Sequence, residues 1–204
     1  MLVWLAVSIL VFIFSAEVLN ALTPFLTLVF NSLVDNYHGA ITVVQGTAQD
    51  TLSVRVTILK PIYIEKIPVA PPGYVLSTGT DIVHNLVPIV IFVTGLLSWP
   101  TKTLSDRFLL CLIGIPFLLL LIALSIPTLL MGHIEATMLN AAQNLADHDL
   151  ATPFIMNWVV FIETGGRWLL PLMLLVICVL ILNSSRTFLL KALRIQSTQQ
   201  KVSV

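Results

Sequence analysis

The chain has 204 residues, of which 57% are hydrophobic and only 10% are charged. This shortage of charge and the mean hydropathy of +1.00 exclude an ordinary soluble domain, in which about a quarter of the residues are charged. Ten basic and ten acidic residues give a net charge of zero, so there is no overall field to attract nucleic acid. The composition predicts an integral membrane protein.

Four apolar stretches are long enough to cross a hydrocarbon layer of ~30 Å, which takes about 20 helical residues. Their apolar cores are residues 2–22, 82–99, 108–131 and 157–183, within transmembrane segments assigned to 1–30, 81–100, 108–132 and 153–185. The first helix reaches Phe30 if it continues past a kink at Pro24. The predicted fold class is therefore mainly α, a polytopic membrane protein with four transmembrane helices and a small extracytoplasmic β segment.

The segment 31–80, after the first helix, changes from continuous to alternating apolar residues. In "LSVRVTIL" one face of a strand would carry Leu52, Val54, Val56 and Ile58. A second run, "AITVV", precedes the turn-like "QGTAQD", and "PIYIEKI" follows. These runs predict a β-hairpin or a three-stranded sheet. The proline-rich "PVAPPGY" is expected to end the strands and lead back to the membrane.

Residues 133–152, after the third helix, have apolar side chains at helical spacing. Ile134, Met138, Ala142 and Leu145 recur every three or four positions, with polar residues elsewhere on the helical wheel. This pattern predicts a separate amphipathic helix that lies on the outer membrane surface.

Basic residues near the membrane ends predict the orientation. The link 101–107 and the tail 186–204 together carry six of them, and the segments on the opposite side carry four. This asymmetry places both the link and the tail in the cytoplasm and the β segment outside. We therefore expect a multi-pass protein of the bacterial inner membrane with both termini cytoplasmic.

A polar cluster is predicted at the outer edge of the membrane. In "FIETGGRW" Glu163 and Arg167 are four residues apart, which permits an ion pair on one helical face. Glu17 and Asp81 are expected at a similar depth if helices one, two and four form a bundle, and His84 shares a helical face with Asp81. Arg167 would then be the common partner of the carboxylates. The Glu163–Arg167 pair is either a membrane anchor or part of a partner-binding cluster, and Glu17 is interfacial or mid-membrane depending on where the first helix begins.

All four histidines are expected on the outer side, close to acidic residues. Histidine and carboxylate groups suit zinc or copper, so one hypothesis is a metal enzyme that uses His84, His133 and His148 with Asp81 or Glu163. The sequence contains no HExxH, nucleotide-binding or nucleophile-elbow motif. We therefore predict no catalytic residue, no metal and no cofactor.

The overall plan resembles the small membrane proteins associated with exosortases of the H type. The second helix opens with Asn85 and Pro88, as in that family, and its end carries a small residue and a proline before basic residues. The last helix has a proline, Pro171, after its first turn. The residues at the end of the second helix that carry this likeness are Ser98, Pro100, Lys102 and Arg107. The resemblance implies a non-catalytic companion of a membrane enzyme that processes C-terminal sorting signals.

Two functional hypotheses outside catalysis follow. The first is a non-enzymatic accessory protein that packs on a larger integral membrane partner, in keeping with the resemblance and with helices rich in Leu, Ile and Val. The alternative is a small structural subunit of a respiratory or transport complex. Both predict the lipid bilayer and a membrane protein as partners, and neither involves nucleic acid or an identified small-molecule substrate.

Overall fold

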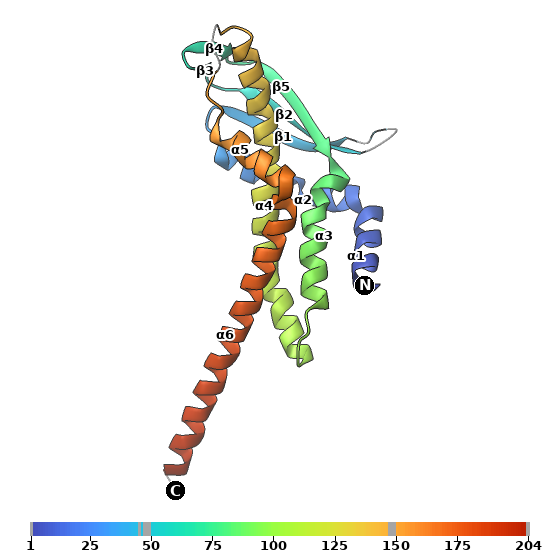
Figure 1. Ribbon diagram of the computed structural model, residues 1–204, viewed down its shortest axis with the longest axis vertical. Helices are drawn as coiled ribbons and strands as arrows, with labels where there is room; N and C mark the ends of the chain where they lie inside the picture. Colours follow the sequence, from blue (N-terminus) through green and yellow to red (C-terminus); the bar gives the residue numbers. More distant parts are fainter. Residues whose placement is uncertain (1, 45, 47–49, 147–149, 203–204) are drawn as a thin grey trace.

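The computed structural model describes the backbone of residues 2–44, 46, 50–146 and 150–202. It is mainly helical, with a small antiparallel sheet at one end of an elongated helical bundle (Figure 1). One helix, α4 (Leu104–Gln143), runs from the bundle onto the sheet. A single hydrophobic core joins the sheet to α2 (Ser15–Leu33), α3 (Ile82–Ser98) and α4. The sheet is therefore packed directly on the bundle.

Among the described residues, three helices are long and apolar enough to span a membrane, and this number differs from the four predicted. They are Ser15–Leu33, Leu104–Gln143 and Phe154–Ser184. The predicted second span corresponds to α3, which is apolar but has only 17 residues, about 25 Å of helix.

The predicted first span is broken at Phe14 rather than at Pro24. Helix α1 (Leu2–Ile13) ends there, and α2 turns away from it and passes behind α3 and α4 (Figure 1). Phe14 has φ −102° and ψ 21°, outside the helical region, whereas Pro24 lies inside α2. Burial explains the new direction, because Leu19, Leu26 and Phe30 of α2 are fully buried in the core shared with the sheet. The prediction of one continuous helix over 1–30 is wrong.

An amide clamp fixes the end of α2 to the first strand. The Asn31 side chain donates to the carbonyl of Gly39 at 3.0 Å and accepts from the Gly39 backbone N–H at 2.8 Å. Gly39 is needed at this contact, because a Cβ there would lie 2.6 Å from the Cε1 atom of buried Phe30.

The predicted alternation of apolar residues in the outer segment is confirmed. Strand β2 (Thr51–Ile58) is central in the antiparallel order β1-β2-β5, between β1 (Tyr37–Val44) and β5 (Val75–Asp81). The four predicted inward residues of β2 are all at most 1% exposed: Leu52, Val54, Val56 and Ile58. They face α2 and α4, while the opposite face of β2 carries the exposed Arg55 and Thr57.

The prediction for the end of the β segment was wrong in two respects. Residues of "PVAPPGY" do continue as a strand, β4 (Ile67–Ala70), which pairs with β3 (Ile62–Ile64) in a separate hairpin. Pro68 is tolerated because this hairpin has only two strands, so neither is a central strand. The third strand of the sheet is β5, and it leads directly into α3, where the Asp81 side chain accepts from the Val83 N–H at 2.9 Å and caps the helix.

The predicted surface helix over 133–152 is instead the end of α4. At 1.5 Å per residue the 40 residues of α4 reach about 60 Å, so the helix extends past the bundle to the sheet. Its predicted apolar positions Ile134, Met138 and Ala142 are buried, against the sheet and the β3–β4 hairpin rather than on lipid, whereas Leu145 is exposed. Pro116 and Pro127 lie inside α4 without ending it.

The bundle is completed by α5 (Phe154–Phe161), a π-helical turn η1 (Ile162–Gly166) and α6 (Arg167–Val202). Residues 186–204 were predicted as a tail, but the backbone stays helical as far as Val202. Glycines permit close helix packing here. A Cβ on Gly95 of α3 would overlap the Leu175 side chain of α6, and a Cβ on Gly114 of α4 would lie 2.5 Å from Leu96 Cδ1.

Candidate functional site

The π-helical turn η1 positions the predicted Glu163–Arg167 pair. Such turns insert one extra residue into a helix and are frequent at functional sites. The sequence permits this one through the glycines of "ETGG": a Cβ on Gly166 would lie 2.8 Å from the Phe161 ring and 3.0 Å from the Phe161 carbonyl oxygen. Gly166 is therefore tightly enclosed, whereas a Cβ on Gly165 would meet nothing within 4 Å.

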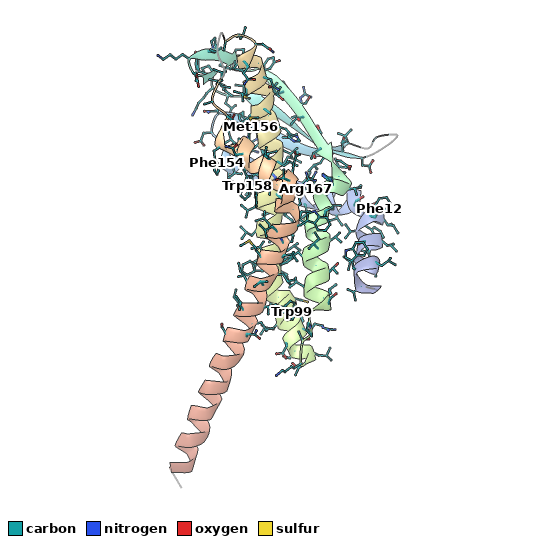
Figure 2. The ribbon with its side chains drawn as sticks, viewed as in Figure 1. Phe12, Trp99, Phe154, Met156, Trp158 and Arg167 are labelled. Carbon is teal, nitrogen blue, oxygen red and sulfur yellow. The ribbon has the colours of Figure 1, made fainter. Side chains whose placement is uncertain are left out.

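Arg167 is a buried cation. The residue is 6% exposed and lies near the level at which β5 gives way to α3 (Figure 2). Its Nη2 atom is 3.7 Å from Glu163 Oε1, while its Nη1 atom is buried and has no hydrogen-bond partner among the described residues. Taking a charge out of water is costly unless its donors are satisfied. The guanidinium is thus only partly compensated within this chain.

His133 of α4 joins this pair from the neighbouring helix. Its Nε2 atom is 3.9 Å from the same oxygen, Glu163 Oε1, and the side chains of His133 and Glu163 are 31% and 49% exposed. A protonated His133 would add a second cation to the carboxylate. Sequence reasoning placed His133 on the outer side but not in the cluster. His133 and Glu163 lie on different helices, so local spacing carries no signal for this contact.

Contacts between α4 and α5 hold the three side chains in register. The Trp158 indole N–H donates to the Thr128 hydroxyl at 3.1 Å and to the Leu124 carbonyl at 3.3 Å. One turn away, Gly132 of α4 lies so close to Val159 of α5 that a Cβ would overlap Val159 Cγ2. The distance from His133 to Glu163 depends on this close approach.

The structure does not bring Glu17 and Asp81 to Arg167. Both carboxylates line a separate hollow of about 540 Å³ together with Asp50. Among the described residues neither forms an ion pair with Arg167, whose acidic partner is Glu163. Glu17 is exposed in the first turn of α2, beside the bend at Phe14, because α2 turns away there. The prediction that Arg167 is the common partner of all three carboxylates is wrong.

His84 also lies outside the cluster. It is exposed near the start of α3. In the part of the chain that the structure describes, no three His, Cys, Asp or Glu side chains are grouped to hold a metal ion. His148, which entered the metal hypothesis, lies outside the described residues.

Tyr37 is a buried polar residue that sequence reasoning missed. It begins β1 with 4% exposure and packs on Phe30 with ring centroids 6.0 Å apart. Its hydroxyl is buried with no hydrogen-bond partner among the described residues. Burial, and to a lesser degree the nearby charge of Glu135, raise the pKa of Tyr37. The neutral phenol is therefore strongly favoured in the folded protein.

We expect Tyr37→Phe to stabilise the protein. Removing an unsatisfied buried hydroxyl without changing the ring should raise the free energy of unfolding by about 1 kcal/mol. Tyr37 has a higher pKa folded than unfolded, so its contribution to stability is present below about pH 10 and lost as the pH rises further. The phenylalanine variant lacks this loss. Thermal unfolding in detergent at neutral pH and above about pH 10 measures both effects, and a less stable variant would show that the hydroxyl is hydrogen-bonded.

Comparison with models of known protein families, with curated protein sequences and with solved structures gives no match for this chain.

Proposed function

We propose that this chain is a non-catalytic accessory protein of the membrane that packs on a larger integral membrane partner. The observation that carries the proposal is the outward face of α6. Side chains at four-residue intervals there are about half exposed, although all are large and apolar: Trp168, Leu172, Val176 and Leu180, with Leu169, Met173 and Ile177 beside them. Such a continuous stripe is suited to another helix.

The proposed topology places the sheet outside and both termini in the cytoplasm. Both ends of the chain point away from the sheet, and so does the α3–α4 link that carries Lys102 (Figure 1). In this topology α3, α4 and α5–α6 cross the bilayer, and α1 lies beside α3 as the fourth, shorter apolar helix. Helix α2 is long and apolar enough to span, but it packs against the sheet instead. A cysteine placed at Thr57 should react with a membrane-impermeant maleimide in intact cells, and one placed at Lys102 should not. The reverse labelling would invert the topology.

Two further features support an accessory role. The open face of the sheet is mostly polar, with His38, Thr42, Arg55 and Ser77 exposed beside Val44 and Val75. The inner face is fixed by the core shared with α2 and α4. The resemblance to proteins associated with exosortases gives the class of partner, an enzyme that processes C-terminal sorting signals. The sheet would then lie in the same compartment as the exported proteins that such an enzyme processes.

Photo-crosslinking in native membranes tests the proposal. A photoreactive residue at Leu180, which is 58% exposed, is compared with one at the adjacent Val179, which is 8% exposed and points into the bundle. We expect position 180 to capture one integral membrane protein larger than this chain, and position 179 not to capture it. Purification of that protein should in turn recover this chain.

The outcomes separate the functional alternatives. A sorting or export enzyme as the captured protein supports the accessory role, and a redox or pump subunit supports the structural-subunit alternative. Capture of lipid only, or the same products from both positions, would overturn a packed partner on α6. Hydrolytic or transfer activity of the purified chain would contradict the non-catalytic role.

A further inference from the structure

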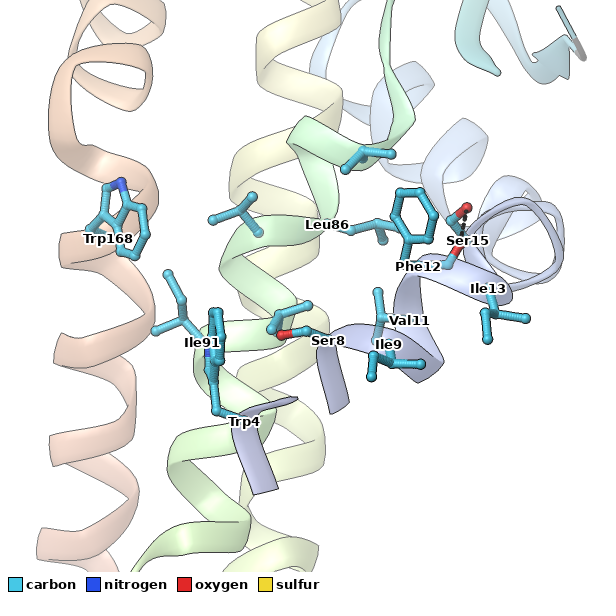
Figure 3. A pocket seen from close by; sticks show the side chains of 13 residues that line it. Trp4, Ser8, Ile9, Val11, Phe12, Ile13, Ser15, Leu86, Ile91 and Trp168 are labelled. Atoms are coloured by element: carbon cyan, nitrogen blue, oxygen red, sulfur yellow. Dashed lines mark hydrogen bonds between the residues drawn. The ribbon is translucent and has the colours of Figure 1, made fainter. Parts of the chain in front are cut away.

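A groove of about 470 Å³ lies between α1 and α3, with Trp168 of α6 across α3 (Figure 3). Its walls are almost wholly apolar: α1 contributes Trp4, Ile9 and Phe12, and α3 contributes Leu86 among others. On α1 the lining runs from Trp4 to Ile13, about 15 Å of helix, and Ser15 at the start of α2 adds to it. In the described structure α1 packs mainly on α3 and not on the rest of the bundle. In the proposed topology the groove between these two helices is therefore exposed to the lipid chains.

One polar atom in the groove lacks a partner. Ser8 of α1 lines it, and the Ser8 hydroxyl is buried without a hydrogen bond among the described residues. Serine in a helix commonly donates to a carbonyl one turn earlier, as Ser125 does to Leu121 at 2.7 Å. The Ser8 hydroxyl is covered by protein atoms, so an acceptor in the groove would reach it only after the side chain rotates.

The groove continues into the acidic hollow at the bend between α1 and α2. The two spaces share Phe12, Ile13, Ser15 and Val83. Three carboxylates line the hollow, Glu17, Asp50 and Asp81, and its described lining has no basic side chain. The sequence of the adjoining segment 45–50, "QGTAQD", contains no basic residue either. An apolar space thus opens onto a negatively charged one at the sheet end of the bundle.

The size of the groove decides between two apolar occupants. A helix about 10 Å in diameter fills roughly 420 Å³ in each turn of 5.4 Å, so the groove would hold little more than one turn of a transmembrane segment. Its volume falls instead in the range of about 300–1,000 Å³ that small-molecule sites have. A flexible hydrocarbon chain can follow such a groove along its whole length.

We propose that this groove binds the acyl chain of a phospholipid whose headgroup carries an amine. The chain lies between α1 and α3, the glycerol region lies at the bend where the two spaces share Phe12 and Ser15, and the ammonium group meets Glu17, Asp50 and Asp81. Anionic headgroups are disfavoured by the same carboxylates. The groove shares only Trp168 with the outward face of α6 and requires no protein partner, so its test is independent of the proposed function.

Tryptophan fluorescence provides the test, because Trp4 and Trp168 both line the groove. The purified protein in detergent micelles is titrated with phosphatidylethanolamine or phosphatidylglycerol carrying brominated acyl chains, which quench nearby indoles. We expect quenching at a several-fold lower ratio of lipid to protein for phosphatidylethanolamine. The Trp4→Phe/Trp168→Phe variant should lose this difference between the two lipids.

Two variants separate the chain site from the headgroup site. Val87→Phe fills the groove and should abolish the preferential quenching, whereas Val176→Phe is a matched control on the outward face of α6 and should leave it unchanged. Glu17→Gln with Asp50→Asn keeps the groove and the Asp81 cap but should remove the preference for the amine. This second variant tests the proposal even if Val87→Phe does not fold. Equal quenching by the two lipids, a preference for phosphatidylglycerol, or full quenching of Val87→Phe would overturn it.

Discussion

Gly132→Ala is expected to lower the free energy of unfolding by about 1–3 kcal/mol, the usual cost of overpacking a well-packed contact. The new Cβ would overlap Cγ2 of Val159, and Val159 is only 9% exposed, so that side chain has little room to move. The Ile155 carbonyl oxygen, 3.7 Å from the same position, limits movement of the α5 backbone. Helices α4 and α5 must therefore separate, and thermal unfolding in detergent should show the loss.

A second substitution tests the cause of this loss. Val159→Ala removes the overlapping methyl group, so Gly132→Ala/Val159→Ala should be more stable than the sum of the two single effects predicts. Gly165→Ala is the matched control, because a Cβ at Gly165 meets nothing within 4 Å, and its effect should be small. Strictly additive effects at positions 132 and 159 would show that the helices are not in this close contact.

The outer sheet was the most predictable part of the fold. A strand with one buried face alternates apolar and polar residues. Strand β2 shows this alternation because it is the central strand and its inward side chains pack on α2 and α4. Strand β5 was missed because "VLSTGTD" offers only Val75 and Leu76 as large apolar residues. Its pairing with β2, rather than its own composition, makes it a strand.

The helical breaks were hard to predict because tertiary packing determines them. Phe14 is neither glycine nor proline, and the chain bends there because α2 gains burial against the sheet. The reverse error occurred in α4, where the polar residues after Gly132 suggested the end of a membrane span. The helix continues because those residues pass beside a folded sheet rather than into water. Lipid and a protein core both favour apolar side chains, so the hydropathy of a helix does not show which of the two surrounds it.

The part of the polar cluster that lies on one helix could be predicted from local spacing. The Glu163–Arg167 pair is separated by one helical turn, and the structure shows it, with the turn widened into η1. Contacts between helices were less accessible: His133 was missed, and Glu17 was placed beside Arg167 on the assumption that the first helix was continuous. The bend at Phe14 removes the basis for that assumption.

The burial of Arg167 leads to an expectation that spacing alone would not give. We expect Glu163→Gln to destabilise the isolated protein by about 1–3 kcal/mol, because it leaves a buried guanidinium without its carboxylate. Glu163 is about half exposed, which keeps the effect below that of a fully buried pair. Arg167→Met should be better tolerated, with a stability equal to or above that of the parent, since it removes the buried charge and the unsatisfied Nη1 donor while a flexible apolar side chain fills the space.

Stability and assembly should therefore respond differently to these two variants. If the Glu163–Arg167 pair contributes to binding of a partner through the half-exposed Glu163, Arg167→Met will unfold at the parental temperature or higher, and yet recover less of the protein that is crosslinked from position 180. Thermal unfolding of the purified protein measures the first quantity and the yield of the crosslinked product measures the second. Lys60→Ala, at an exposed position after β2, is the control for loss of a cation and should change neither. An Arg167→Met protein that is less stable than Glu163→Gln would mean that the guanidinium is fully compensated within the fold, and the cluster would then be an anchor.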